Sequence, residues 1–330
     1  MMQNAPIVTI FGGSGFVGRY IAQAMARAGW RVRVAVRRPN EALFVRTYGV
    51  VGQVEPMQAN IRDDASCRAA IAGATAVINC VGILFRNGKN TFDSVQDEGA
   101  GRIARIAREE GADRFVQISA IGADAESRSA YARTKARGEA AVLEQFPDAV
   151  ILRPSIVFGP EDGFFNRFAA MTRISPAVPM VGANTRFQPV YVDDVADAAA
   201  KAALGEAEPG IYELGGPDIE SFRALMLRML RIIRRRRILL PIPFWAATAQ
   251  AAVLDLIPIF TLGILPNSLL TKDQVRLLRK DNLVGEGVKT FADLGITPRE
   301  MDGILESYLY SYRPQGQYTA LTESARNLRG

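Results

Sequence analysis

Apolar positions in the first half of the chain follow two spacings that alternate along it. Short runs of consecutive apolar residues, typical of strands buried on both faces of a sheet, are separated by stretches with an apolar stripe at helical spacing. The clearest stripe lies in FVGRYIAQAMARAG, which ends at Gly29. The strand-like runs are IVTIF (7–11), RVRVAV (31–36), AVINCVG (76–82), FVQIS (115–119) and AVILRPS (149–155). This alternation predicts an α/β fold in which residues 1–155 form a doubly wound parallel sheet.

After residue 156 the alternation loosens, although two further strands are predicted at PVYV (189–192) and IYELGG (211–216). The helices predicted in this half are 193–204, 221–233, 246–256, 271–280 and 298–312. We therefore expect residues 156–310 to form a smaller, mostly helical cap that is interleaved with the last strands of the sheet. Residues 311–330 lack any periodicity, and we expect them to form an extended tail.

The composition excludes several classes of site. The chain of 330 residues contains no histidine, which removes histidine-based triads, imidazole bases and zinc–histidine centres, and we expect no metal. Its two cysteines, Cys67 and Cys80, form no CxxC pair and fit a reducing, cytoplasmic compartment. The N-terminus has no signal-peptide pattern. A net charge of +6 favours an anionic partner such as a nucleotide or an anionic lipid.

A glycine-rich stretch, GGSGFVG, directly follows the first predicted strand and opens the first predicted helix. Glycines in this context allow a tight turn, a close backbone approach to a pyrophosphate, and close packing of helix on strand. The phosphates then lie at the positive end of the helix. The pattern predicts a dinucleotide site that includes Gly12, Gly15, Phe16, Val17 and Gly18; a tight turn alone is the alternative.

Two arginines, Arg37 and Arg38, end the second predicted strand. NAD sites usually have an acidic residue here for the ribose 2′-hydroxyl, whereas arginine accommodates a 2′-phosphate. The residues therefore favour NADPH or NADP over NAD, the alternative being a solvated basic turn. Asp63, in ANIRDD, is a further candidate partner, for the adenine amino group.

A possible catalytic set lies in the second quarter of the chain. Tyr131 and Lys135, in SAYARTK, share one helical face, and Ser119 stands at the end of the strand FVQIS. Lys135 could hold the nicotinamide ribose and lower the pKa of Tyr131, which would then act as general acid or base while Ser119 fixes a substrate carbonyl. The alternative is an ordinary surface pair of tyrosine and lysine.

With these motifs, and with NCVG (79–82), LRPSIVFGP (152–160) and VYVDDVADA (190–198), the chain resembles the short-chain dehydrogenase/reductase superfamily in its extended or atypical branch, which includes proteins similar to NAD-dependent epimerases and dehydratases. The resemblance implies a Rossmann fold, a bound dinucleotide, and Ser119, Tyr131 and Lys135 as the potential catalytic set. It also implies a cofactor cleft lined by Asn79, Val81 and Gly82, with Pro154 and Ile156 near the nicotinamide half.

Three C-terminal stretches narrow the resemblance: LTKDQVRLLRKDNLV (270–284), FADLGITP (291–298) and SYRPQGQY (311–318). They resemble the NADPH-binding accessory subunits of respiratory complex I, the NADH:ubiquinone oxidoreductase. That family implies a tightly bound dinucleotide off the electron path and a structural or assembly role. It also implies other complex I subunits as partners, near the junction of the hydrophilic and membrane arms. The location would be peripheral, on the mitochondrial matrix side or the cytoplasmic face of the bacterial inner membrane. The alternative is an active reductase, dehydrogenase or epimerase acting on a lipid, quinone or sugar nucleotide.

Six arginines fall between Arg228 and Arg237, and a long apolar stretch follows them. Prolines and Asp255 interrupt the apolar tract at 238–270, so we expect it to lie against a membrane or another subunit rather than to cross a bilayer. A helix that simply ends in cations and rejoins the cap is the alternative. Nucleic acid is not an expected partner, because the basic patch is short and its neighbours are aliphatic.

Overall fold

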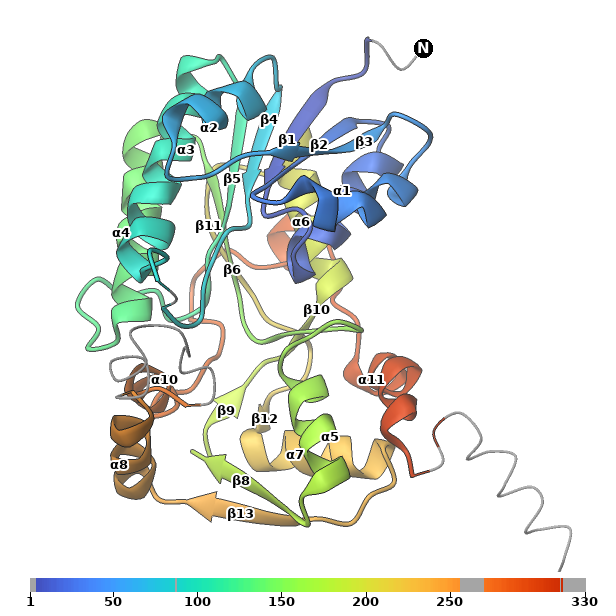
Figure 1. Ribbon diagram of the computed structural model, residues 1–330, viewed down its shortest axis with the longest axis vertical. Coiled ribbons are helices and arrows are strands. Elements are labelled where there is room, and N and C mark those ends of the chain that lie inside the picture. The colour runs from blue at the N-terminus through green and yellow to red at the C-terminus, as the bar shows by residue number, and fades with distance from the viewer. Residues whose placement is uncertain (1–3, 87, 256–269, 315, 317–330) are drawn as a thin grey trace, which may run out of the picture.

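The computed structural model describes residues 4–86, 88–255, 270–314 and 316. Its largest element is a seven-stranded sheet in which every pairing is parallel, in the order β11-β6-β5-β4-β1-β2-β3 (Figure 1). The strands are β1 (Ile7–Phe11), β2 (Arg31–Val36), β3 (Val54–Gln58), β4 (Ala76–Asn79), β5 (Arg114–Ile118), β6 (Val150–Pro154) and β11 (Gly210–Leu214). The predicted doubly wound parallel sheet is therefore confirmed.

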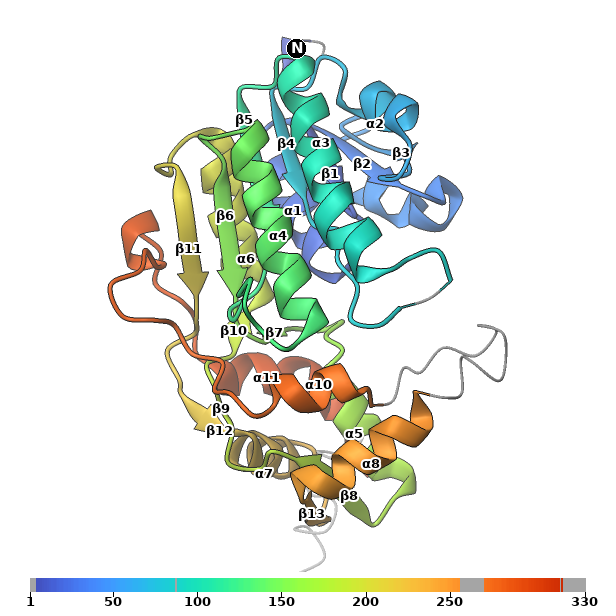
Figure 2. The same ribbon diagram turned by 90° about the vertical axis from the view of Figure 1, so that its left-hand side faces the viewer.

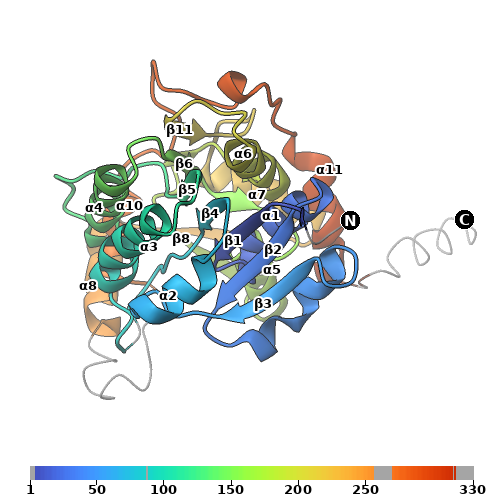
Figure 3. The same ribbon diagram turned by 90° about the horizontal axis from the view of Figure 1, so that it is seen from above.

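Helices cover both faces of this sheet and enclose two separate cores (Figure 3). One face carries α1 (Phe16–Arg27), which packs on β1 and β2, and α6 (Val192–Leu204), which packs on β4, β5 and β6. The other face carries α2 (Asp64–Ile71), α3 (Glu98–Glu109) and α4 (Ala130–Gln145). Burial on both faces explains why the central strands are apolar at nearly every position.

The strand β3 (Val54–Gln58) was absent from the apolar runs of the sequence. It lies at the edge of the sheet, where only Val54 is buried, and its sequence VEPMQ is correspondingly mixed. A strand with so little buried surface leaves no continuous apolar signal, although its backbone pairs with β2 along its whole length.

Below the sheet, the second half of the chain forms a smaller body around a cluster of phenylalanines, methionines and leucines (Figure 1). Its helices are α5 (Phe165–Ile174), α7 (Phe222–Ile232), α8 (Phe244–Leu254), α10 (Lys272–Leu277) and α11 (Met301–Leu309). Its strands pair two by two: β7 (Val157–Phe158) with β10 (Val190–Tyr191), β8 (Ala177–Val181) with β13 (Ile238–Ile242), and β9 (Arg186–Phe187) with β12 (Glu220–Ser221). Between these pairs the chain returns to the sheet through α6 and β11.

Several predicted segments extend beyond the described residues. Position 256 of the predicted helix 246–256, the stretch 256–269 of the apolar tract, and most of the predicted tail (315 and 317–330) lie outside them. The start of that tail belongs to a 3-10 turn, Tyr310–Tyr312. No helix within the described ranges has both the length and the apolar composition that a bilayer span requires.

Candidate functional site

The glycine loop forms a backbone cradle between β1 and α1. Gly12 has a φ of +74°, a left-handed conformation that glycine adopts without strain, and its N–H donates to Ala35 (3.0 Å). A Cβ on Gly18 would collide with the carbonyl oxygen of Gly12 and would lie 2.8 Å from Cα of Gly13. The N-cap residue of α1, Gly15, forms no side-chain cap bond, and the first turn has no acidic residue. The free N–H groups of that turn can therefore bind an anion.

The start of α1 is held in place by its own side chains. Val17 packs against the core, and the ring of Phe16 meets Tyr20 edge-on at 6.1 Å between centroids. The hydroxyl of Tyr20 donates to Glu161 (2.7 Å), and Arg19 pairs with the same carboxylate at 3.3 Å. These contacts tie the glycine loop to the loop that follows β7.

The two arginines after β2 lie at the same edge of the sheet as the glycine loop, because β2 pairs directly with β1. Both side chains are exposed. Arg38 pairs with Glu41 at 3.0 Å, and Nη1 of Arg37 donates to Oδ1 of Asn90 at 3.4 Å. Nη1 of Arg62 donates to the carbonyl oxygen of Lys89 (3.0 Å). The loop after β4 thus joins the basic cluster, which the order of residues in the sequence did not reveal.

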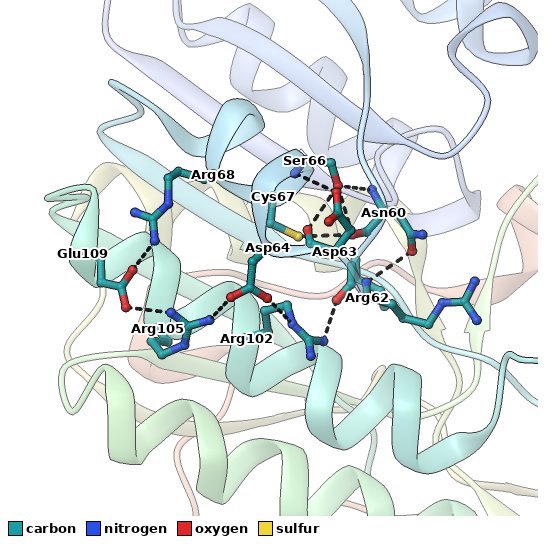
Figure 4. A network of polar contacts seen from close by, with 11 residues as sticks. Asn60, Arg62, Asp63, Asp64, Ser66, Cys67, Arg68, Arg102, Arg105 and Glu109 are labelled. Atoms are coloured by element: carbon teal, nitrogen blue, oxygen red, sulfur yellow. Dashed lines mark hydrogen bonds and ion pairs between the residues drawn. The ribbon is translucent and has the colours of Figure 1, made fainter.

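Asp63, predicted to meet an adenine, is the N-cap of α2, and its carboxylate accepts the N–H of Ser66 at 2.9 Å (Figure 4). Next to it, hydrogen bonds from Arg105 and Arg102 hold the pKa of Asp64 below its ordinary value. Nη1 of Arg102 also donates to the carbonyl oxygen of Ile61 (2.9 Å). This network fixes the turn 60–63 at the end of β3 against α3.

The turn after β4 faces the glycine loop. Asn79 is fully buried, its Nδ2 donates to Gln117 (2.9 Å), and its Oδ1 accepts the N–H of Val81 (3.1 Å). Asn79 therefore shapes this turn. A Cβ on Gly12 would lie 3.3 Å from Cγ2 of Val81, and a Cβ on Gly82 would lie 3.3 Å from Nζ of Lys135. These residues bring the glycine loop and the start of α4 to one edge of the sheet.

The hydroxyl of Ser119 donates to the carboxylate of Glu139. Glu139 is buried and is held by Arg153, whose Nε lies 3.0 Å from Oε1 and whose Nη2 lies 2.5 Å from Oε2. The other side of Arg153 faces Glu213 at 3.4 Å. The Ser119 proton is thus directed into a buried ionic network. Glu139 was missed, although Tyr131, Lys135 and Glu139 continue a single spacing of four residues.

Burial dominates the electrostatics of Tyr131 and Lys135. It raises the pKa of Tyr131 to about 12, and it lowers the pKa of Lys135 to about 8 against the opposing effect of Glu139. Nζ of Lys135 donates to the carbonyl oxygen of Ile118 at 3.2 Å. In this arrangement Tyr131 is neutral near pH 7, and the expected lowering of its pKa by Lys135 is not seen.

A C-terminal segment that sequence reasoning did not connect to the site crosses the carboxyl edge of β5 and β6 (Figure 2). The carboxylate of Asp273 accepts the hydroxyl of Ser129 (2.7 Å) and the N–H groups of Ala130 (2.7 Å) and Tyr131 (3.1 Å). Asn282 accepts the hydroxyl of the nearby Ser155 at 2.6 Å. The segment therefore lies over the start of α4.

The remaining predicted residues lie at the same edge. Pro154 ends β6, and its carbonyl oxygen accepts the N–H of Ile121 (3.0 Å). Ile156 packs at the margin of the lower core, and its carbonyl oxygen accepts the N–H of Val190 (2.9 Å). The fold thus places the predicted site residues along the carboxyl edge of the sheet, from β3 to β6, where open α/β sheets bind ligands.

Comparison with known proteins agrees with this geometry. A model of the NAD dependent epimerase/dehydratase family matches residues 8–215. NADH dehydrogenase (ubiquinone) 1 alpha subcomplex subunit 9 of Arabidopsis thaliana, a mitochondrial protein, is 35% identical over 97% of this chain and 81% of that protein. The ceramide reductase of Caulobacter vibrioides is 33% identical over 210 residues, 63% of this chain and 64% of that protein.

Among solved structures, an NADPH-dependent quinone oxidoreductase from Escherichia coli, complexed with NADPH, is similar with a TM-score of 0.69. The similarity covers 92% of this chain and 98% of that chain at 16% identity, and it bears on the fold alone. The chain belongs to the NAD dependent epimerase/dehydratase family and to the family of the NADH dehydrogenase (ubiquinone) 1 alpha subcomplex subunit 9 proteins.

Proposed function

We propose that the chain is an accessory subunit of the membrane-bound NADH:ubiquinone oxidoreductase, in which a bound NADP(H) serves structure or assembly and lies off the electron path. The observation that carries this proposal is the 35% identity to an alpha subcomplex subunit 9 over nearly the whole chain. The similarity continues through the C-terminal half, beyond the residues that the general family model matches.

The preference for NADP(H) over NAD(H) rests on charge. Arg37 and Arg38 follow β2 where an acidic residue would select a ribose 2′-hydroxyl, and Arg62 adds a third cation at this edge of the sheet. A guanidinium donates paired hydrogen bonds to phosphate oxygens, so a 2′-phosphate is the ligand group that suits these side chains.

Two contacts favour a dinucleotide with a structural role over one that is oxidised and reduced in catalytic turnover. The hydroxyl of Ser119 is engaged by Glu139, and the C-terminal segment is anchored over the start of α4 through Asp273. A substrate carbonyl held by Ser119 has to displace the hydrogen bond between Ser119 and Glu139. A bound NADP(H) at the glycine loop leaves both contacts in place.

The partners are other complex I subunits, and the location is peripheral, on the mitochondrial matrix side or the cytoplasmic face of the bacterial inner membrane, with membrane lipid within reach. To test this, membranes are solubilised gently and the particle that holds the chain is purified. We expect complex I subunits in stoichiometric amounts and NADP(H) among the nucleotides released on denaturation. Recovery of the chain as a free monomer would contradict the proposed role, and release of NAD(H) would contradict the cofactor.

The second candidate is an active reductase acting on a lipid carbonyl. It is favoured by Ser119 directly after β5, by Tyr131 and Lys135 on α4, and by the similarity to a ceramide reductase. Rotation of the Ser119 hydroxyl away from Glu139 would complete the catalytic set. NADPH consumption by the purified chain with ceramide-like ketones separates this candidate from the accessory subunit, for which we expect no turnover.

A further inference from the structure

One end of the molecule carries apolar side chains that nothing among the described residues covers. They belong to β13, to α8 and to the end of α5, along the edge that lies farthest from the large sheet (Figure 1). Their exposed fractions are unusually high for such side chains: Ile174 92%, Ile238 68%, Leu240 51%, Trp245 77% and Val253 66%. We call this surface, together with the arginines that precede β13, the β13 face.

The local structure explains why these side chains point outward. β13 is paired with β8, and its successive side chains alternate, so that Leu239 meets the lower core while Ile238 and Leu240 face away. Ile242, at the end of the strand, packs against the small cluster around Ala247 and Ala251. α8 contains no charged residue, yet only Ala247 and Ala251 are buried. Apart from Thr248 and Gln250 its side chains are apolar, so most of its exposed surface is apolar and is suited to an apolar neighbour.

The arginines beside this apolar surface carry charge that carboxylates do not neutralise. Arg228 pairs with Glu220 and Asp302. In contrast, Arg231 and Arg236 are exposed and form no ion pair with a carboxylate among the described residues.

Two further arginines of the β13 face are anchored by their Nε atoms to backbone carbonyl oxygens. Arg235 donates to Tyr312 (2.8 Å) and Arg237 donates to Thr172 (2.9 Å). Burial and the neighbouring cations Arg237 and Arg173 lower the pKa of Arg235, so the cluster is electrostatically unfavourable until anions approach it. The bonds hold these two side chains in place beside the exposed arginines.

An apolar groove of about 340 Å³ lies at the far end of β13 from the arginines. Pro241, Pro243 and Phe244 form one wall, and the turn 182–185 forms the other. The guanidinium of Arg279 stacks over the ring of Phe244 at 4.8 Å, so a cation marks this end of the face as well. The β13 face is therefore an apolar strip with positive charge at both ends.

We infer that the β13 face docks on the surface of an anionic phospholipid bilayer, with the arginines on the headgroup phosphates and Ile238, Leu240 and Trp245 at the boundary with the acyl chains. The inference rests on the proposed function and assigns its lipid contact to particular residues. Cations that attract several phosphates, beside aliphatic side chains and a tryptophan, match the layered chemistry of a membrane surface. The dinucleotide edge of the sheet then remains in water.

The test uses the full chain, which has two tryptophans, and a Trp30→Phe background leaves Trp245 as the only tryptophan, which is excited selectively over the tyrosines. We expect its emission to shift to the blue with vesicles of phosphatidylglycerol and phosphatidylcholine, and the shift to weaken as salt is added. Co-sedimentation of the unmodified chain with the same vesicles gives a second readout. Vesicles of phosphatidylcholine alone should leave the chain in solution.

Charge variants then locate the surface. Arg231→Gln with Arg236→Gln should lower partitioning about thirtyfold, since each cation near an anionic leaflet contributes roughly fivefold. The matched control, Arg46→Gln with Arg128→Gln, removes the same charge from exposed arginines elsewhere and should leave partitioning within about twofold. Trp245→Ser with Leu240→Ser should reduce binding at high salt, where the apolar contact dominates.

Absence of binding to anionic vesicles at low salt would overturn the inference, as would an equal loss in both arginine pairs. If the β13 variants bound vesicles normally but no longer assembled with complex I subunits, the face would be a protein interface and the lipid assignment would be wrong. Failure of the proposed function looks different: the unmodified chain would not be recovered with complex I at all, whatever the vesicles show.

Discussion

The carboxylate of Asp273 makes the most specific contact between the C-terminal segment and the nucleotide-binding half. It accepts three hydrogen bonds at the start of α4, from the hydroxyl of Ser129 and from the N–H groups of Ala130 and Tyr131. In Asp273→Ala, Ser129 keeps its own bond to the N–H of Ala132 (3.3 Å), so the loss falls mainly on two backbone donors of the first helical turn.

The expected loss follows from these contacts. A hydrogen bond to a charged group contributes about 1.5–3 kcal/mol, and a helix N-cap about 1 kcal/mol. Because the site is partly exposed, water replaces some of the lost bonds, and we expect Asp273→Ala to lower the free energy of unfolding by about 2–3 kcal/mol. Asp273→Asn keeps an acceptor but loses the charge at the helix N-terminus, and should cost about 1 kcal/mol.

Urea denaturation followed by far-UV circular dichroism measures both variants. Glu286→Ala is the control, because Glu286 is an exposed carboxylate of the same C-terminal stretch, and it should change stability by less than about 0.5 kcal/mol. If Asp273→Ala unfolded within that margin of the unmodified chain, the segment would not be anchored through this carboxylate. If Asp273→Asn lost as much as Asp273→Ala, charge rather than hydrogen-bond acceptance would carry the contact.

Three further predictions follow from the site. Gly18→Val should abolish dinucleotide binding in equilibrium titrations, because a side chain there collides with the backbone of the glycine loop. If the variant still bound dinucleotide, the glycine loop would not be the binding site. Tyr131→Phe should assemble with complex I and retain nucleotide unchanged, whereas an active reductase would lose about 10²–10⁴ in turnover. Burial lowers the pKa of Lys135 from 10.5 to about 8, so its charge destabilises the fold below pH 8 and this cost is relieved as pH rises toward 10.5. The unfolding free energy should therefore rise over that window, relative to a Lys135→Met variant, by up to about 3 kcal/mol. If the difference between the two proteins did not change with pH, the Lys135 ammonium would not be buried.

Local patterns determined much of this protein. Strands buried on both faces, such as β1 (Ile7–Phe11), are visible in the sequence as continuous apolar runs. The glycine spacing after β1 follows from the backbone geometry that a phosphate-binding turn of this kind requires. Gly12, Gly15 and Gly18 could thus be assigned from neighbouring residues alone. The edge strand β3 could not, because a strand with one buried residue has no period to detect.

Only the tertiary structure decided which side chains meet. Ser119 and Glu139 are 20 residues apart, and Asp273 and Tyr131 are 142 apart, so no spacing in the sequence relates them. The direction of the Ser119 hydroxyl depends on Arg153, which holds a buried carboxylate within reach. The outward position of Ile238 and Leu240 likewise depends on the register of β13 with β8. Sequence periodicity reports burial along one element, whereas hydrogen-bond partners and exposed faces are set by the packing of elements that are distant in the chain.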